Sequence, residues 1–278
     1  MIKNNIKTVF LLAGLSGILL WVGNMLGGPQ GLVIALIFAL IFNIGSYWFS
    51  DKIVLRMYNA TPIDKHQDKH IYNIVRELAI NTAIPMPKIY RIHAPHANAF
   101  ATGRNPKHAA VAITEGIERL LTERELRGVL AHELSHIKNR DTLIVTIAAT
   151  MAAVISYVAI MARWAAIFGG SRDNDNSMFE FLALAILTPI MATIIQLAIS
   201  RSREYLADER AAKISGDPKA LASALRKLHE GSHHHPFRAG SQSTASLFIV
   251  NPFRSGTLMR LLSTHPPAAK RIEKLENM

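Results

Sequence analysis

The segment His132–His136 reads His-Glu-Leu-Ser-His. Residues four apart lie on one face of an α-helix, so His132 and His136 can turn their imidazoles toward one point. Two neutral imidazoles about 2.0–2.1 Å from a common centre form half of a tetrahedral zinc site. Glu133 is placed to accept a proton from a water molecule at the metal. The segment therefore predicts a site for one zinc ion per chain, with Glu133 as the catalytic base.

The flanking residues predict that this segment lies on a helix over 121–140. Thr122 is a suitable N-cap, and Glu125, three residues later, completes a capping box. Apolar residues at helical spacing would form its buried stripe: Leu126, Val129, Leu130 and Leu134. Two histidines four apart on a helix also occur without a metal, so the zinc interpretation needs a third ligand.

Glu204 is the candidate third ligand. It comes five residues after an apolar run that ends at 199, and His136 comes about seven residues before an apolar run that begins at 143. At about 1.5 Å of rise per helical residue, both lie within roughly 10 Å of the same membrane face if the runs cross a bilayer. Two histidines and one glutamate leave the fourth position for water, which is the arrangement of catalytic zinc sites.

Asp208 follows Glu204 by one helical turn in a segment of helical pattern over 200–213. We expect it to accept the free N–H of a ligand histidine and so to orient that ring. The alternative is that both carboxylates belong to a solvated face and pair with Arg201 and Arg210. The histidine motif upstream favours the ligand interpretation.

Three short strands are predicted before the motif helix, at 88–92, 97–102 and 109–113, in a small antiparallel sheet. Thr114 would cap a short helix after them. An edge strand beside a zinc cleft can bind an extended peptide by strand addition. The candidate substrate-binding residues on that strand are Asn98, Ala99, Phe100, Ala101 and Thr102. An ordinary sheet edge explains the same residues equally well.

Half of the 278 residues are hydrophobic and 18% are charged, which indicates that part of the chain lies in lipid. Two pairs of apolar runs approach the roughly 20 residues that a membrane helix needs. A cleavable signal peptide does not explain the first run, because a second run follows at once. Buried helices of a large soluble core are the remaining alternative. The predicted spans are about 9–26, 32–49, 143–165 and 179–199.

The distribution of basic residues predicts the orientation. The short connections 27–31 and 169–177 carry one arginine between them, whereas several lysines and arginines follow the second and fourth runs. Basic segments stay on the cytoplasmic side, so both termini and the active site should be cytoplasmic. The predicted organisation is a hairpin at 1–50, half a catalytic domain at 51–141, a hairpin at 142–199 and the other half at 200–278.

The net charge of +11 suits either nucleic acid or an anionic membrane surface. The long apolar runs favour the bilayer as the partner, and no nucleic-acid module is recognisable, so no nucleic-acid partner is expected. The chain has no cysteine, which excludes disulfides, thiol nucleophiles and cysteine-ligated zinc.

The sequence resembles the HtpX family of membrane zinc metalloproteases, relatives of the CAAX prenyl proteases with a gluzincin-type site. The blocks 98–103, 132–136 and 200–208 carry the resemblance, and Asn251-Pro252 and 263–267 also match. The four apolar runs match in number and placement, so the resemblance covers nearly the whole chain. It implies a mainly α membrane protein with four transmembrane helices and an α+β, zincin-like cytoplasmic catalytic domain.

The resemblance implies endopeptidase activity in the bacterial cytoplasmic (inner) membrane, within protein quality control. The expected substrates are misfolded or surplus membrane proteins and unfolded polypeptides, the chain itself among them through self-cleavage. It also implies that His265 of the His-Pro-Pro block stabilises the oxyanion, with Arg201 as a second candidate. Alternatively, His265 merely precedes a final helix at 268–275.

The sequence leaves two alternative functions. A prenyl-protein processing protease would need a lipid-accommodating chamber, for which four spans are too few. A non-catalytic membrane adaptor with a structural zinc site would not need Glu133. The polar stretch 231–246, with three adjacent histidines, is expected to be a loop rather than a second metal site.

Overall fold

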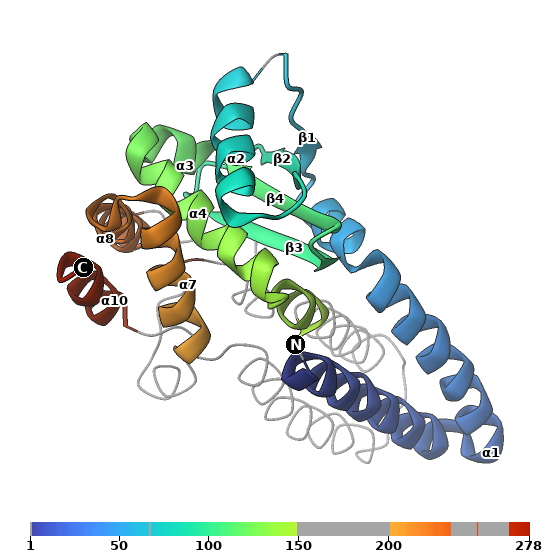
Figure 1. The fold of residues 1–278 in the computed structure, drawn as a ribbon. Coiled ribbons are helices and arrows are strands. Elements are labelled where there is room, and N and C mark those ends of the chain that lie inside the picture. The colour runs from blue at the N-terminus through green and yellow to red at the C-terminus, as the bar shows by residue number, and fades with distance from the viewer. Residues whose placement is uncertain (1, 67, 149–200, 235–248, 250–266) are drawn as a thin grey trace.

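The computed structural model of this chain describes residues 2–66, 68–148, 201–234, 249 and 267–278. Figure 1 shows a body of sheet and helices, from which the two arms of the first helix project. The elements are α1 (Ile2–Met57), β1 (Thr61–Pro62), α2 (Lys69–Thr82), β2 (Lys88–Ile92), β3 (Ala99–Asn105), β4 (His108–Thr114), α3 (Glu115–Leu120), α4 (Glu123–Asn139), α7 (Arg201–Ser215), α8 (Pro218–His234) and α10 (Ala268–Glu276).

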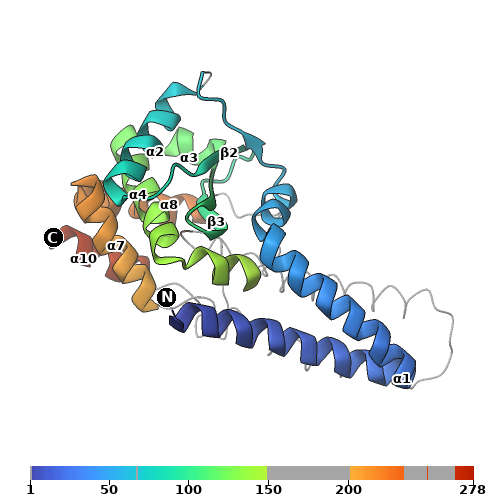
Figure 2. The ribbon, with the colours of Figure 1, turned by 45° about the vertical axis from the view of Figure 1, so that its right-hand side comes forward.

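The first predicted hairpin is present as the two arms of α1, which fold back on each other (Figure 2). The helix is broken at Gly27 and at Gly28, whose φ of 54° is a conformation that favours glycine. The arms touch near the turn: a Cβ on Gly23 would come within 2.6 Å of the Gly31 carbonyl oxygen. Asn43 Nδ2 also donates to Ser16 Oγ across the arms, at 2.7 Å.

Among the described residues, the second arm of α1 (Gly27–Met57) is long and apolar enough to cross a membrane. The apolar helix in the first arm, Thr8–Trp21, is shorter. Residues 142–148 are helical, but the rest of the predicted spans 143–165 and 179–199 lies outside the described residues. The four-span topology and the domain boundaries derived from it therefore stay predictions.

The sheet is mixed, so the prediction of an antiparallel sheet was wrong. Its strand order is β1-β2-β4-β3, with β2 parallel to β4 and the other neighbours antiparallel. A tight turn of two residues joins Asn105 to His108 and makes β3 and β4 a hairpin. The six residues between β2 and β3 instead carry the chain past the position of β4, so β4 inserts between the two strands. As a result, β3 lies at an edge of the described sheet.

Both faces of the sheet are buried, which explains why its strands read as apolar runs. Side chains alternate between the faces. The face toward the helices holds Ala99, Ala101, Val111 and Ile113. The opposite face packs on the end of α1 through Phe100, Ala110 and Ala112, beside Val54 and Leu55.

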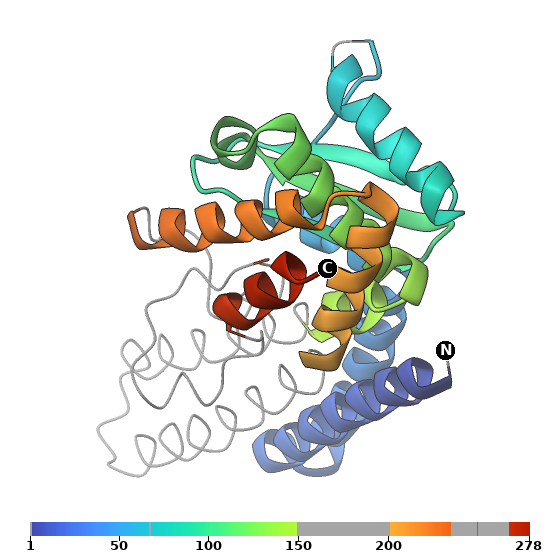
Figure 3. The ribbon, with the colours of Figure 1, turned by 60° about the vertical axis from the view of Figure 1, so that its left-hand side comes forward.

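One hydrophobic core includes residues from before 149 and after 200. It joins α2, the sheet and α4 to α7, α8 and α10, and Figure 3 shows α7, α8 and α10 gathered on one side of α4. Helix α8 was not predicted, and it includes the first four residues of the expected loop 231–246. The remainder of that loop, 235–246, lies outside the described residues.

Candidate metal centre and active site

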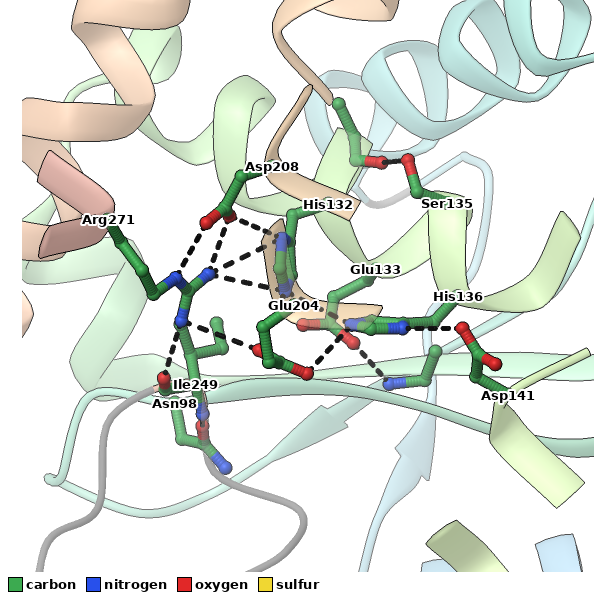
Figure 4. Close-up of polar contacts among 12 residues, drawn as sticks. Asn98, His132, Glu133, Ser135, His136, Asp141, Glu204, Asp208, Ile249 and Arg271 are labelled. Atoms are coloured by element: carbon green, nitrogen blue, oxygen red, sulfur yellow. Dashed lines mark hydrogen bonds and ion pairs between the residues drawn. The ribbon is translucent and has the colours of Figure 1, made fainter. Parts of the chain in front are cut away.

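The side chains of His132, His136 and Glu204 converge on one point, and their ligand atoms all lie within 4.8 Å of one another (Figure 4). The two Nε2 atoms are 3.2 Å apart. Glu204 Oε2 is 3.7 Å from His132 Nε2, and Glu204 Oε1 is 3.5 Å from His136 Nε2. Ligand atoms at about 2.0–2.1 Å from a tetrahedral ion lie roughly 3.3 Å apart, so this donor set fits such an ion.

Helix α4 places the two histidines as the sequence predicted. The capping box is formed: Thr122 Oγ1 accepts from the Glu125 N–H, and the Glu125 carboxylate accepts from the Thr122 N–H. All four residues of the predicted apolar stripe are buried. That burial fixes the rotation of α4 about its axis, which turns His132 and His136 toward α7, where Glu204 lies in the first turn.

A buried carboxylate contacts His132 at Nδ1, the ring nitrogen that faces away from the cluster. That nitrogen lies 2.9 Å from Asp208 Oδ1, the orienting contact expected from the sequence. Burial alone would lower the pKa of His132, but the hydrogen bonds to Asp208 and Glu204 outweigh it and raise the pKa to about 9 in the metal-free chain. The ring is thus surrounded by acceptors that favour a positive charge, and a metal ion can supply that charge.

Arg271 of α10 completes this network, and the sequence analysis missed it. Its guanidinium donates to both oxygens of Asp208, at 2.8 and 2.7 Å, and its Nη1 lies 3.5 Å from Glu204 Oε2. Arg271 is 1% exposed. Burial would raise the pKa of Asp208, but Arg271 and His132 hold it below its usual range. The signal in the sequence was one arginine on the apolar face of a short helix, which is too weak to place it at the site.

The second proposed ligand, His136, also contacts a carboxylate that the sequence did not predict. Asp141 Oδ2 lies 3.3 Å from His136 Nδ1. Arg140 ends α4 in the left-handed conformation, with φ of 58°, and folds the chain back so that the Asp141 N–H donates to the His136 carbonyl at 3.0 Å. No helical spacing predicts a contact that depends on this turn.

Glu133 lies beside the cluster and is 6% exposed. Its Oε2 accepts from the backbone N–H of Ala101 on β3, at 2.8 Å. Burial raises the pKa of the Glu133 carboxyl, and the nearby Glu204 adds to this, against the opposing effect of the two histidines. A buried carboxylate with a raised pKa next to a cluster of candidate metal ligands is suited to accept and release protons.

The predicted substrate-binding residues lie along β3, except Asn98, which directly precedes it, and they face in different directions. Ala99 and Ala101 are on the face toward the helices, whereas Phe100 packs on Tyr58 behind the sheet. Asn98 Oδ1 accepts from the Ile249 N–H at 3.3 Å, and Thr102 Oγ1 lies 3.0 Å from Thr146 Oγ1. The strand contacts Glu133 through the backbone N–H of Ala101.

The structure describes no side chain for two of the predicted residues. His265 precedes the described start of the last segment at residue 267, and Arg201 opens α7 with a side chain that is not described. Their proposed roles at the oxyanion stay predictions.

Comparisons with known proteins agree over most of the chain. The model of "Peptidase family M48" matches residues 65–278. The "Protease HtpX homolog" of Syntrophobacter fumaroxidans is 52% identical over 277 residues, which cover 98% of each chain. The protein of the same name from Thermococcus kodakarensis is 49% identical over 98% of this chain and 95% of its own length.

A solved structure, "Crystal Structure of S. mikatae Ste24p", has a similar fold. The TM-score is 0.52 at 20% sequence identity, and the match covers 99% of this chain and 66% of that one.

Proposed function

Because the chain belongs to peptidase family M48 and is therefore a metalloprotease, we propose that it is a zinc-dependent endopeptidase of the cytoplasmic membrane. In this proposal it cleaves misfolded or surplus membrane proteins and unfolded polypeptides on the cytoplasmic side. The observation that carries the proposal is the spacing of His132, His136 and Glu204, whose closest interatomic distances of 3.2–3.7 Å fit one tetrahedral ion.

The donor set favours zinc. Two imidazoles and one carboxylate, with the fourth position left to water or substrate, form the ligand set of catalytic zinc sites. Asp208 and Asp141 each hold the Nδ1 side of one histidine, which leaves both Nε2 atoms facing the centre. When bound, zinc would supply a Lewis acid for the scissile carbonyl and acidify the attacking water.

Glu133 moves the protons in this proposal. Its buried carboxylate takes a proton from the attacking water and passes it to the leaving amine. The N–H of Ala101 keeps one carboxylate oxygen fixed, at 2.8 Å, so the other oxygen is free to exchange the proton. His265 and Arg201 are proposed to stabilise the oxyanion.

The substrate would bind as an added strand along β3, over Asn98–Thr102. Strand β3 is an edge of the described sheet, and its backbone reaches the proposed base through Ala101. Strand addition uses backbone hydrogen bonds and therefore accepts many sequences. That suits an enzyme whose substrates share unfolding rather than a sequence motif.

The membrane location is supported by the apolar second arm of α1, which carries exposed Val33, Ile34, Ile37, Phe38 and Ile41. These side chains would cost free energy in water and favour lipid. The proposed topology is multi-pass, with both termini and the active site in the cytoplasm.

Zinc content and casein cleavage, measured together on detergent-purified protein, test the catalytic part. We expect wild type to hold one zinc per chain and to cleave, and Glu204→Ala to lose both. Glu209→Ala is the matched control, because Glu209 lies on the same helix but is exposed and paired with Lys213 at 2.6 Å. One full zinc equivalent in Glu204→Ala would show that the ligand set is wrong.

The absence of cysteine allows a direct test of orientation. Single cysteines replacing Lys65 and Ser171 would be labelled with a membrane-impermeant maleimide in right-side-out and inverted vesicles. The cytoplasmic proposal predicts that Lys65→Cys reacts in inverted vesicles only and Ser171→Cys in right-side-out vesicles only. The opposite pattern would place the active site outside the cytoplasm.

A further inference from the structure

The residues directly after α4 contact both sides of the active site. Asp141 touches a proposed metal ligand, and Thr142 and Thr146 touch the strand that reaches the proposed base. All three are buried, at 3% exposure or less. We call Asp141, Thr142 and Thr146 the junction, because they open the helical stretch 142–148 that leads toward the third apolar run.

On the metal side, the junction acts through Asp141. His136 turns Nε2 toward His132 and Glu204, and its Nδ1 lies 3.3 Å from Asp141 Oδ2. A metal bound at Nε2 would leave the ring proton on Nδ1, which would then donate to Asp141. The other oxygen, Oδ1, lies 3.8 Å from Arg203 Nη1 on α7. The arrangement parallels His132, whose carboxylate Asp208 is in turn held by Arg271. Each ligand histidine is therefore backed by an aspartate and an arginine.

On the strand side, the junction acts through threonine hydroxyls. Thr142 Oγ1 donates to the carbonyl of Gly103 at 2.9 Å, and Thr146 Oγ1 lies 3.0 Å from Thr102 Oγ1. Gly103 is two residues beyond Ala101, about 7 Å along the strand. Ala101 itself donates to Glu133. The position of β3 relative to the proposed base is therefore set both by that hydrogen bond and by the contacts of the two threonines.

A purely structural explanation covers part of these contacts. Asp141 precedes the helical stretch 142–148, where aspartate is a good N-cap, and Thr146 donates to the Thr142 carbonyl at 2.7 Å. Neither role requires Asp141 Oδ2 to reach His136, nor Thr142 Oγ1 to turn away from its own helix to a strand. The contacts that leave the helix are the ones that touch the site.

We propose that the junction is a positioning element with two separable actions: Asp141 orients His136 for the metal, and Thr142 holds β3 at the distance from Glu133 at which a substrate strand can be cleaved. The proposal rests on the zinc peptidase function above. It assigns positioning roles to residues that touch neither metal nor substrate. It also links the active site to the start of the third apolar run.

The metal action is tested by zinc affinity, measured by competition with a chromogenic chelator, and by the visible absorption of the cobalt-substituted protein. Asp141→Ser keeps an N-cap but is too short to reach His136, so we expect affinity to fall about 10–100-fold and the cobalt spectrum to change. Asp141→Asn keeps both the N-cap and an acceptor oxygen, so its zinc affinity should fall by less. Equal affinities and spectra in wild type and Asp141→Ser would overturn this action.

The strand action is tested by Thr142→Val, which keeps the shape and removes the hydroxyl. We expect the KM for a peptide substrate to rise several-fold while zinc affinity and the cobalt spectrum stay at wild-type values, and Thr142→Ser to restore KM. A wild-type KM in Thr142→Val, or a loss of zinc in it, would overturn the separation of the two actions.

The Glu204→Ala protein separates failure of this inference from failure of the proposed function. Suppose that wild type binds zinc and Glu204→Ala does not. If Asp141→Ser then has the zinc affinity of wild type and Thr142→Val has its KM, only the junction proposal is wrong. If Glu204→Ala binds zinc as tightly as wild type, the ligand set itself is wrong and the junction proposal falls with it.

Discussion

Helix α4 carries two buried glutamates, eight residues apart, that differ in almost everything except burial. Glu125 in the first turn is 5% exposed, and Glu133 in the third is 6% exposed. The pKa of Glu125 is lowered and the pKa of Glu133 is raised. Their donors account for the difference.

Glu125 is surrounded by donors from helix α8 and from the N-cap of its own helix. Its carboxylate accepts from the N–H and hydroxyl of Thr122, from Ser223 Oγ at 2.7 Å and from Lys227 Nζ at 2.8 Å. Burial alone would raise the pKa of Glu125, but the bonds from Lys227, Ser223 and Thr122 lower it to about 2. This carboxylate joins α4 to α8 and is an anion at neutral pH.

Glu133 has only the Ala101 N–H among the donors that the described residues show for it. Its other neighbours are the two histidines and Glu204, and Glu204 repels its charge. A carboxylate with unused acceptor capacity and a raised pKa can exchange protons, whereas a saturated one cannot. The number of donors, rather than burial, therefore separates the structural glutamate from the proposed catalytic base.

Glutamine at each position gives the largest expected contrast. Glu133→Gln should lower kcat about 10²–10⁴-fold with zinc still bound, because the amide cannot take up the proton. Glu125→Gln should keep most of the activity of the folded fraction. Casein cleavage per bound zinc measures both. Comparable losses of cleavage in Glu133→Gln and Glu125→Gln would show that the two glutamates do not differ in catalytic role.

The stability of the metal-free protein should show the reverse order. Glu125→Gln loses the charge-assisted bond to Lys227, which we expect to cost on the order of 2 kcal/mol. Glu133→Gln removes a buried charge with one donor and should be as stable as wild type or more so. Denaturant midpoints in detergent with excess chelator provide the comparison, and a larger loss in Glu133→Gln would contradict it.

The acid range sharpens the same contrast. A lowered folded pKa means that Glu125 contributes its full stability above the ordinary value of 4.5 and loses it as pH falls toward about 2. We expect the gap in unfolding midpoint between wild type and Glu125→Gln to be largest near pH 7 and to narrow below pH 4.5. The raised pKa of Glu133 acts in the opposite sense, favouring the folded state at acid pH. A gap that does not change with pH would remove the electrostatic explanation.

The smallest expected effect is at the cap. Thr122→Ala loses the hydroxyl that accepts from the Glu125 N–H and donates to its carboxylate. The expected cost is about 1 kcal/mol with activity per zinc unchanged. Thr122→Ser keeps the hydroxyl and should be close to wild type in the same unfolding assay. A loss of zinc in Thr122→Ala would mean that the first turn of α4 also positions the metal site.

Much of the motif helix could be predicted from the sequence because its determinants are local. The capping box, the buried stripe and the spacing of His132 and His136 depend on residues within one helix, and all are present in α4. The position of Glu204 beside the two histidines was also predicted from the sequence, on the expectation that the two apolar runs between Glu204 and His136 form a hairpin. Asp208 follows from Glu204 by one helical turn.

The order of the strands in the sheet could not be predicted, because it depends on how distant segments pack and not on the order of the strands along the chain. The chain order of β2, β3 and β4 suits several sheets, and only the packing of both sheet faces places β4 in the middle. The same holds for the edge position of β3, on which the proposed substrate site depends.

The sequence by itself determined the proposed ligand set and the proposed base, since on a helix of 3.6 residues per turn side chains four apart lie on one face. Only the tertiary structure decided what surrounds them: Arg271 from the last helix, Asp141 from a left-handed turn, and the Ala101 N–H from a sheet edge. These groups are far apart in the chain or lie beyond a turn, so their meeting depends on the packing of the whole core. The physical reason is that helical spacing is set by neighbouring residues, whereas the electrostatic surroundings of a buried group are set by all the elements packed against it.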